Sequence, residues 1–182
     1  MPTQASDRGI ASEAVYFAAN DYAGFWRRVV VECADVLAIV LLLVVLTAML
    51  FAVLALGGLL LCWAAAVYWY FVIVKRSRFH TVGYRLGRVR IVDVRGQPPS
   101  QRALTLRLLF AVLGPFNIVL DLLWIPSDPY KQSLRDKVAH TYVVKASAPP
   151  AGPARVVYRN YYMMGMSFVF QEIEPLGPSR AS

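Results

Sequence analysis

VLAIVLLLVVLTAMLFAVLALGGLLLCWAAAVYWYFVIV, from Val36 to Val74, is the stretch that decides the fold of this chain. None of its 39 residues is charged. One helical span of a bilayer needs about 20 consecutive apolar residues, so the stretch is long enough for two spans. Its one turn signal is the Gly57-Gly58 pair. The sequence therefore predicts a transmembrane hairpin, with a first span at about residues 29–56 and a second at about 59–74.

Aromatic and basic residues flank both ends of this predicted hairpin. The run Phe25–Arg28 precedes the first span, and the run Tyr68–Arg76 ends the second. Aromatic rings collect at water–lipid interfaces, and Lys and Arg concentrate on the cytoplasmic side. We therefore expect a cytoplasmic N-terminus and a very short, uncharged loop on the far side of the membrane.

The basic residues of the chain concentrate next to its apolar segments. The formal net charge is +8, and residues 75–102 alone contain eight of the nineteen Lys and Arg against one acid, Asp93. Anionic lipid headgroups attract such clusters by about 1 kcal/mol per basic residue. The bilayer, with anionic headgroups, is therefore the predicted partner of these charges, and no nucleic acid is expected.

A third apolar segment, residues 103–125, is interrupted in its middle by Gly114–Asn117, which includes a proline. Proline disrupts a helix interior by about 3 kcal/mol. Two arrangements remain open. A re-entrant hairpin would bring Arg107 and Asp121 to a similar depth, where they can pair. A straight span would let each of them reach its own interface. Basic residues on both flanks favour the re-entrant form, which also keeps the C-terminus cytoplasmic.

The polar parts of the chain predict a small β-rich cytoplasmic module. Residues 88–93 nearly alternate polar and apolar side chains, and 141–145 form a second short strand that we expect to pair with them. Beyond residue 154, two runs rich in Val, Tyr and Phe predict a β-hairpin. The expected organisation is a polar N-terminal tail, 1–21, a membrane domain, 22–145, a linker, 146–154, and a C-terminal tail, 155–182.

A stripe of charged residues lies where the first predicted span begins. Arg28, Glu32 and Asp35 are spaced i, i+4 and i+7, so they share one helix face. Counting about 1.5 Å per residue places Asp35 near the cytoplasmic interface rather than at the middle of the bilayer. Charged groups in lipid are costly unless they are paired, so this stripe needs partners from elsewhere in the chain.

Three short motifs, in order along the chain, resemble the RDD family of bacterial membrane proteins, which is named for one Arg and two Asp. They are Tyr22–Arg28, Thr81–Arg85 and Ser133–Thr141. The resemblance places the family arginine at Arg28 and the two aspartates at Asp35 and Asp136. Arg135 and His140 depart from the family pattern, which usually has a His and a Gly there, and Gly87 is a shifted glycine. The further motif positions are Gly24, Phe25, Thr81, Gly83, Arg85 and Thr141.

The family resemblance implies two transmembrane helices, no cofactor and no established reaction, and transport of ions or small ligands has been suggested for the family. Two interpretations of the charges follow. In the structural one, Arg28, Asp35 and Asp136, with Arg107, form a satisfied ion network that clamps the module to the helix hairpin. In the functional one, the carboxylates bind and release a proton or a cation. No motif for a metal, a nucleotide or a catalytic group is present.

Two functions are therefore expected of an inner-membrane protein of this kind. The first is a non-enzymatic accessory or scaffold protein that assembles with other membrane proteins or with its own copies. The second is a small oligomeric transporter of cations or small ligands that uses Asp35 and Asp136. Two spans and a broken third segment cannot enclose an aqueous path alone, which favours the first.

Overall fold

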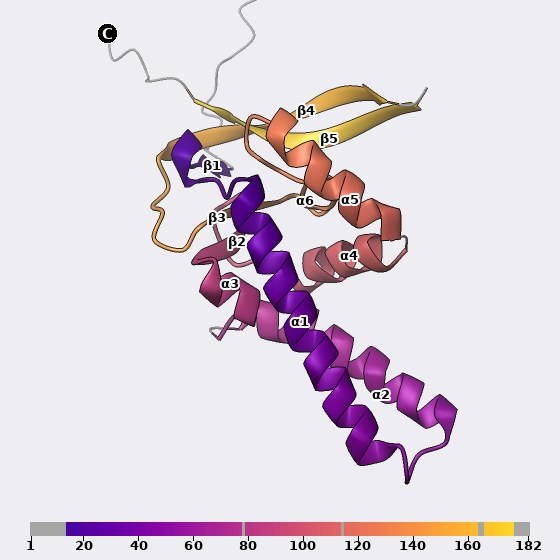
Figure 1. Ribbon diagram of the computed structural model, residues 1–182. Helices are drawn as coiled ribbons and strands as arrows, with labels where there is room; N and C mark the ends of the chain where they lie inside the picture. Colours follow the sequence, from indigo (N-terminus) through magenta and orange to yellow (C-terminus); the bar gives the residue numbers. More distant parts are fainter. Residues whose placement is uncertain (1–13, 78, 114, 164–165, 177–182) are drawn as a thin grey trace, which may run out of the picture.

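The computed structural model describes residues 14–77, 79–113, 115–163 and 166–176. Two long helices, α1 (Phe25–Leu50) and α2 (Leu56–Tyr68), extend side by side away from the rest of the molecule (Figure 1). The π-helical turn η2 (Trp69–Val74) continues α2. Both helices are long and apolar enough to cross a membrane, and only 17% of the apolar window of each is buried. The core helix of a soluble protein would instead be mostly buried.

The turn between α1 and α2 lies at residues 51–55, so the prediction that places it at Gly57-Gly58 is wrong. Both glycines belong to the first turn of α2. Among the described residues, the only glycine with a positive φ is Gly96, so the tip does not need the backbone freedom of glycine. Helix α1 can end at Leu50 because its 26 residues already extend about 39 Å, which exceeds the hydrocarbon thickness of about 30 Å.

The third apolar segment consists of two helices, α4 (Gln101–Val112) and α5 (Pro115–Trp124), rather than one. Each is about 15–18 Å long, which is too short to cross a bilayer. Helix α4 lies across the direction of α1, and α5 turns away from the hairpin tip (Figure 1). The expected pairing of Arg107 with Asp121 does not occur, because each has found a different partner near helix α6 (Leu134–Val138).

A two-stranded sheet occupies the centre of the other end of the molecule. Strand β2 (Val89–Asp93) pairs antiparallel with β3 (Thr141–Lys145), in the register Val89–Lys145 to Asp93–Thr141. The predicted pairing of these two segments is therefore confirmed. Successive side chains of both strands point to opposite faces of the sheet, as expected for strands. One face packs on helices α1, α3 (Val82–Leu86) and α4, and the other packs on a second sheet.

The second sheet has the order β1-β4-β5 and joins the two ends of the chain. Strands β4 (Gly152–Met163) and β5 (Met166–Pro175) form a long hairpin, where the sequence predicts one. Strand β1 (Ala14–Tyr16) pairs with the first residues of β4. The predicted polar tail and linker thus both contribute to a sheet. Strand β1 is only three residues long, and its pairing with the distant strand β4 stabilises it.

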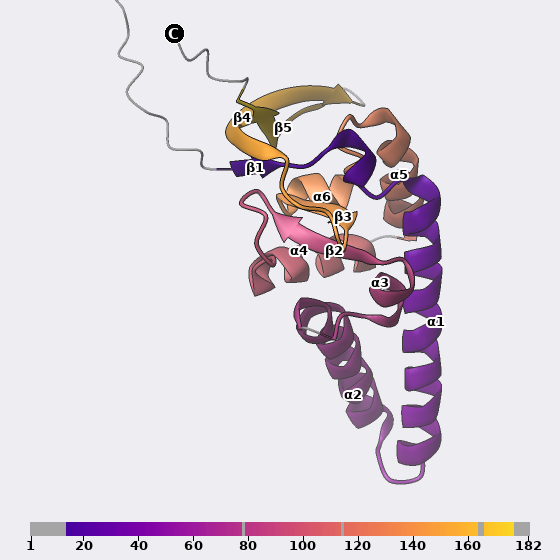
Figure 2. The same ribbon diagram turned by 90° about the vertical axis from the view of Figure 1, so that its left-hand side faces the viewer.

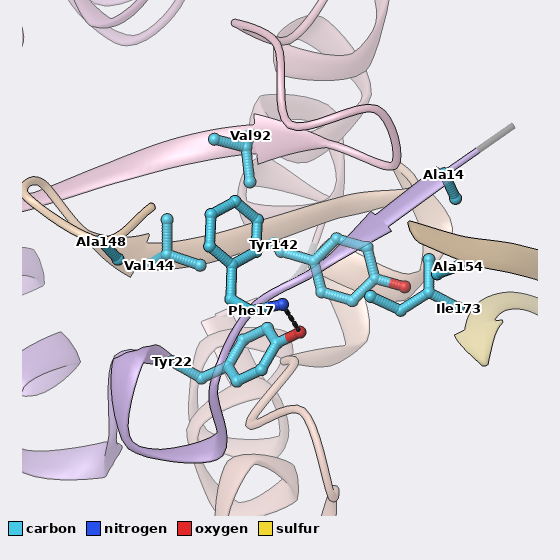
Figure 3. Close-up of a cluster of buried hydrophobic side chains, with 9 residues drawn as sticks. All are labelled: Ala14, Phe17, Tyr22, Val92, Tyr142, Val144, Ala148, Ala154 and Ile173. Atoms are coloured by element: carbon cyan, nitrogen blue, oxygen red, sulfur yellow. Dashed lines mark hydrogen bonds between the residues drawn. The ribbon is translucent and has the colours of Figure 1, made fainter. Parts of the chain in front are cut away.

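The core between the two sheets combines the rings of Phe17, Tyr22 and Tyr142 with small and branched aliphatic side chains (Figure 3). The Tyr22 hydroxyl accepts a hydrogen bond of 3.1 Å from the Phe17 backbone N–H. Burial raises the pKa of Tyr22 to about 12. Short turns η1 (Ala19–Asp21) and η3 (Ile125–Ser127) complete the elements. We call the two sheets with α3, α4, α5 and α6 the module; both sheets lie opposite the hairpin tip (Figures 1 and 2).

Candidate functional site

Helix α6 places three consecutive charged residues, Arg135, Asp136 and Lys137, in the interior of the molecule. The helix begins with a capping box, in which the Ser133 side chain accepts from the Asp136 backbone N–H and the Asp136 carboxylate accepts from the Ser133 backbone N–H. A capping box satisfies backbone donors that a helix start leaves free. Successive helix residues point in different directions, so the three charges reach three different parts of the fold.

Asp136 lies between two arginines from two other helices. Arg28 of α1 donates to its Oδ2, and Arg107 of α4 donates to its Oδ1. Arg107 Nη1 also donates to Thr141 Oγ1 of strand β3 at 2.6 Å. Burial alone would raise the pKa of Asp136, but the guanidiniums of Arg107 and Arg28 outweigh it and hold the pKa well below its usual range. The carboxylate is therefore charged and paired on both oxygens.

Arg28 fixes the start of α1 with all three of its guanidinium nitrogens. Besides Asp136, it donates from Nη2 to the Lys131 carbonyl at 2.7 Å and from Nε to the Ala23 carbonyl at 3.1 Å. Planar guanidinium groups suit such multiple, directional contacts. Arg28 therefore ties α1 to the loop that precedes α6.

Arg135 makes a second connection, from α6 to helices α1 and α5. Its Nη2 donates to Glu32 of α1, and its Nε lies 2.8 Å from Asp121 Oδ2 of α5. Asp121 Oδ1 also accepts from the Arg135 backbone N–H at 2.8 Å. Glu32 and Asp121 are therefore both paired with Arg135, a residue that departs from the family pattern.

Asp35 occupies a separate site, so the prediction of one network containing both aspartates is wrong. Its carboxylate accepts hydrogen bonds from the Tyr70 hydroxyl at 3.0 Å, the Thr81 hydroxyl at 2.7 Å and the Gly83 backbone N–H at 2.7 Å. Lys75 Nζ lies 3.8 Å away. The helix α3 that begins after Thr81 thus uses the carboxylate of Asp35 as its anchor on α1. No charged neighbour in sequence signals this arrangement.

The close approach of α3 to α1 requires glycine at position 83. A Cβ atom there would lie 2.1 Å from the Val31 carbonyl oxygen and 2.8 Å from Asp35 Oδ1. Both distances are too short for real contacts, and the first involves backbone that cannot move away easily. The Thr-x-Gly motif thus supplies two donors to Asp35 and the room that they need.

Lys137 connects α6 to the C-terminal hairpin, a contact that sequence reasoning missed. Its Nζ lies 2.6 Å from Asp128 Oδ1 and donates to Glu172 of β5. The ammonium also lies 4.8 Å from the centre of the Tyr161 ring, within the range of a cation–π contact. The tail hairpin is therefore part of the same ion-paired interior and not an appendage.

The remaining motif residues play smaller parts. Gly24 flanks the start of α1, and Phe25 is its first residue. Arg85 is exposed on α3 and makes no ion pair with the acids that the structure describes. In the described part of the chain, no group of three or more His, Cys, Asp or Glu side chains could hold a metal ion.

The pKa of Asp136 leads to a prediction about pH. Because its folded pKa is held below the ordinary value of 3.8, the stability it contributes is fully present above about pH 5 and is lost as the pH falls through the folded pKa. The unfolding temperature of the wild-type chain in detergent should be flat from pH 5 to 8 and fall below pH 4. An unfolding temperature that changes steeply near neutral pH would mean that a carboxylate of the cluster carries a shared proton.

Comparisons with known proteins agree with the motifs. The sequence matches the RDD family over residues 22–140, which is more than half of the chain. The matched region includes Arg28, Asp35 and Asp136. No curated protein matches. No solved structure matches.

Proposed function

Because the chain belongs to the RDD family, we propose that it is a non-enzymatic accessory or scaffold subunit of a bacterial inner membrane. Helices α1 and α2 would anchor it in lipid, and the module would present a surface on the cytoplasmic side. The basic residues around both helices support this orientation. Both described ends of the chain lie on the module side (Figure 1), which supports cytoplasmic termini.

The observation that carries this proposal is the saturation of the buried carboxylates. Asp35 accepts hydrogen bonds from η2 and from the start of α3, and Asp136 accepts them from α1 and α4. Glu32 and Asp121 are paired with Arg135. A carrier carboxylate has to exchange its proton or cation with water. Asp136, held by an arginine on each oxygen, and Asp35, held by three hydrogen bonds, instead act as fixed joints, which favours the scaffold over the transporter.

The apolar faces of α4 and α5 support a shallow place for these helices in the membrane. Their exposed large apolar residues are Leu106, Leu109, Val112, Val119, Leu120 and Leu123, with Leu113 directly after α4. We infer that this corner enters the lipid from the cytoplasmic side and returns, because neither helix is long enough to cross and α5 leads back to the module. The re-entrant arrangement therefore stays our proposal for residues 103–125.

The outer face of the β4–β5 hairpin is the surface that best fits a partner protein. Tyr158 is 74% exposed and Tyr162 is 80% exposed, and Val169 is exposed beside them. The opposite face is covered, since Tyr161 packs edge-on against Trp124 of α5. Tyrosines are among the residues that contribute most to protein–protein binding, so two of them on a projecting hairpin suit a docking face.

This surface leads to an experiment on assembly. We expect the full chain, extracted from its host in mild detergent, to carry a second membrane protein in fixed ratio. The double variant Tyr158→Ser/Tyr162→Ser should lose that protein, because it removes the exposed aromatic anchors. Arg155→Ser, at the base of the same hairpin, should keep it. Native mass measurement of the purified complexes gives the ratio.

The scaffold proposal fails if the wild-type chain purifies with nothing attached and drives cation flux in liposomes. It also fails if the tyrosine variant keeps its partner at the wild-type ratio, since the hairpin face would then play no part. In both cases the folded state of each variant is checked by its unfolding temperature.

A further inference from the structure

A cavity of about 200 Å³ opens between α1, η2 and α4, at the level where the helix pair meets the module. Its walls are mainly apolar side chains from these three helices. Its lining residues are Glu32, Val36, Ile39, Val67, Phe71, Lys75, Leu104, Arg107, Leu108, Ala111, Val112 and Arg135. Three residues of the charge cluster, Glu32, Arg107 and Arg135, line one end of this space, and the proposed docking face on the hairpin lies elsewhere.

The cavity has a charged end and an apolar end. Along α1, its lining changes from Glu32 to Val36 and Ile39, and this helix runs from the module toward the hairpin tip (Figure 2). Along α2 and η2, which run back toward the module, the first lining residue is Val67 and the last is Lys75. Both helices therefore place their charged residue at the module end and their apolar residues toward the tip. This polarity matches an amphiphile whose headgroup faces the module.

Lys75 is the cation at the charged end that lacks a close partner. Arg107 is bound to Asp136, and Arg135 is bound to Glu32 and Asp121. The Lys75 side chain is only 6% exposed, yet the described residues offer its ammonium no hydrogen bond, and its nearest acid oxygen, on Asp35, lies 3.8 Å away. An ammonium has three donors, and the long ion pair with Asp35 leaves donors available to an acceptor in the cavity.

Aromatic rings hold the Lys75 ammonium in place. Its Nζ lies 4.4 Å from the centre of the Tyr84 ring and 5.4 Å from that of Phe71. Such contacts attract a cation to the ring face and help to fix its position. The ammonium is therefore positioned and still able to donate to an oxyanion that enters the cavity.

We propose that this cavity binds an anionic membrane lipid, with an anionic oxygen of the headgroup on Lys75 and one acyl chain along Val36, Ile39 and Val67. The lipid supplies both the missing acceptor and the apolar filling. The inference goes beyond the scaffold function and needs only that α1 and α2 lie in lipid. A soluble anion would satisfy the ammonium and leave the apolar end empty.

The test uses the full chain in phosphatidylcholine nanodiscs with a photoreactive acyl chain carried on either phosphatidylglycerol or phosphatidylcholine. The anionic probe should label Val36, Ile39 and Val67 about tenfold more than the zwitterionic probe, as expected for one added charge-assisted hydrogen bond. Lys75→Met should reduce this preference to about one. Arg76→Met, the adjacent exposed position that does not line the cavity, should keep it.

A second variant keeps the test informative if Lys75→Met fails to fold. Ala111→Phe fills the cavity from α4 and should lower labelling at the same three residues by either probe. Equal labelling by the two probes in the wild-type chain, an unchanged preference in Lys75→Met, or unchanged labelling of the three residues in Ala111→Phe would overturn the proposal. Displacement of the label by glycerol phosphate would also overturn it, because the anion would then be recognised without a chain.

The lipid-facing residues give an internal reference. Leu41 and Val44 are exposed on α1 and should be labelled equally by both probes. Absence of label at these residues would refute the membrane placement itself, and the site with it. Label at Leu41 and Val44, together with equal labelling of the cavity residues by the two probes, would refute the lipid site but not the membrane placement.

Discussion

Replacing Asp136 with Asn is expected to lower the free energy of unfolding by about 3–5 kcal/mol, the usual cost of breaking a buried ion pair by removing one partner. The neutral amide would leave the guanidiniums of Arg28 and Arg107 without a counter-charge in the interior. It would also place an NH₂ group where the carboxylate now accepts. A domain is stable by only about 5–15 kcal/mol, so little of this variant should purify folded.

Glu174→Gln is the matched control for this prediction. Glu174 pairs with Arg155 at the exposed surface of the tail hairpin, and exposed ion pairs contribute about 0–1 kcal/mol. Folded yield and unfolding temperature in detergent, measured by size-exclusion chromatography after heating, should separate the two variants clearly. Equal unfolding temperatures would show that the Asp136 cluster contributes no more than a surface pair.

Gly83→Ala should destabilise the chain by about 2–6 kcal/mol, although it adds only one methyl group. The methyl carbon would lie 2.1 Å from the Val31 carbonyl oxygen, so α3 has to move away from α1. This movement would stretch or break the hydrogen bond from the Gly83 backbone N–H to Asp35. Overpacking costs about 1–3 kcal/mol, and a buried acceptor that loses its donor adds about 1–3 kcal/mol.

Gly57→Ala should instead increase the stability of the chain. Nothing lies within 4 Å of a Cβ at Gly57, which is in the first turn of α2. Replacing glycine with alanine in a compatible helix position stabilises by about 0.4–1 kcal/mol, because the unfolded chain loses freedom. The unfolding temperatures of the two variants should therefore lie on opposite sides of the wild-type value. A Gly83→Ala variant as stable as the wild type would mean that α3 does not pack closely on α1.

Local patterns in the sequence were sufficient for several elements. A charge-free run of 39 residues predicts two apolar helices of the required length, and they are present. The alternation at 88–93 and the Thr-Tyr-Val-Val run at 141–144 predict the β2–β3 pair. These predictions succeeded because each depends on a period or a length within one short segment.

Contacts between distant segments could not be predicted in the same way. Asp35 accepts hydrogen bonds from Tyr70, Thr81 and Gly83. These residues are uncharged, so the sequence gives no sign that they bind a carboxylate. The family resemblance marked Asp35, Thr81 and Gly83 but not the contacts between them. Lys137 reaches Glu172 across 35 positions of the chain. In each case the pairing follows from packing that no short pattern records.

The misplaced turn has a different cause. Glycine is a turn signal because it adopts backbone conformations that other residues avoid, and the Gly57-Gly58 pair is the only such signal in the apolar run. The turn at residues 51–55 needs none of these conformations. Helix length and packing of α1 against α2 therefore decide where the chain reverses.

The central claim is that the buried carboxylates are fixed joints between the helix pair and the module. It is tested most directly by measuring unfolding temperature and cation flux on the same preparations of the wild type and Asp136→Asn, reconstituted in liposomes. We predict no flux above empty liposomes for the wild type, and a strongly lowered unfolding temperature for the variant. The claim would be contradicted by a wild-type flux that Asp136→Asn abolishes while its unfolding temperature stays unchanged.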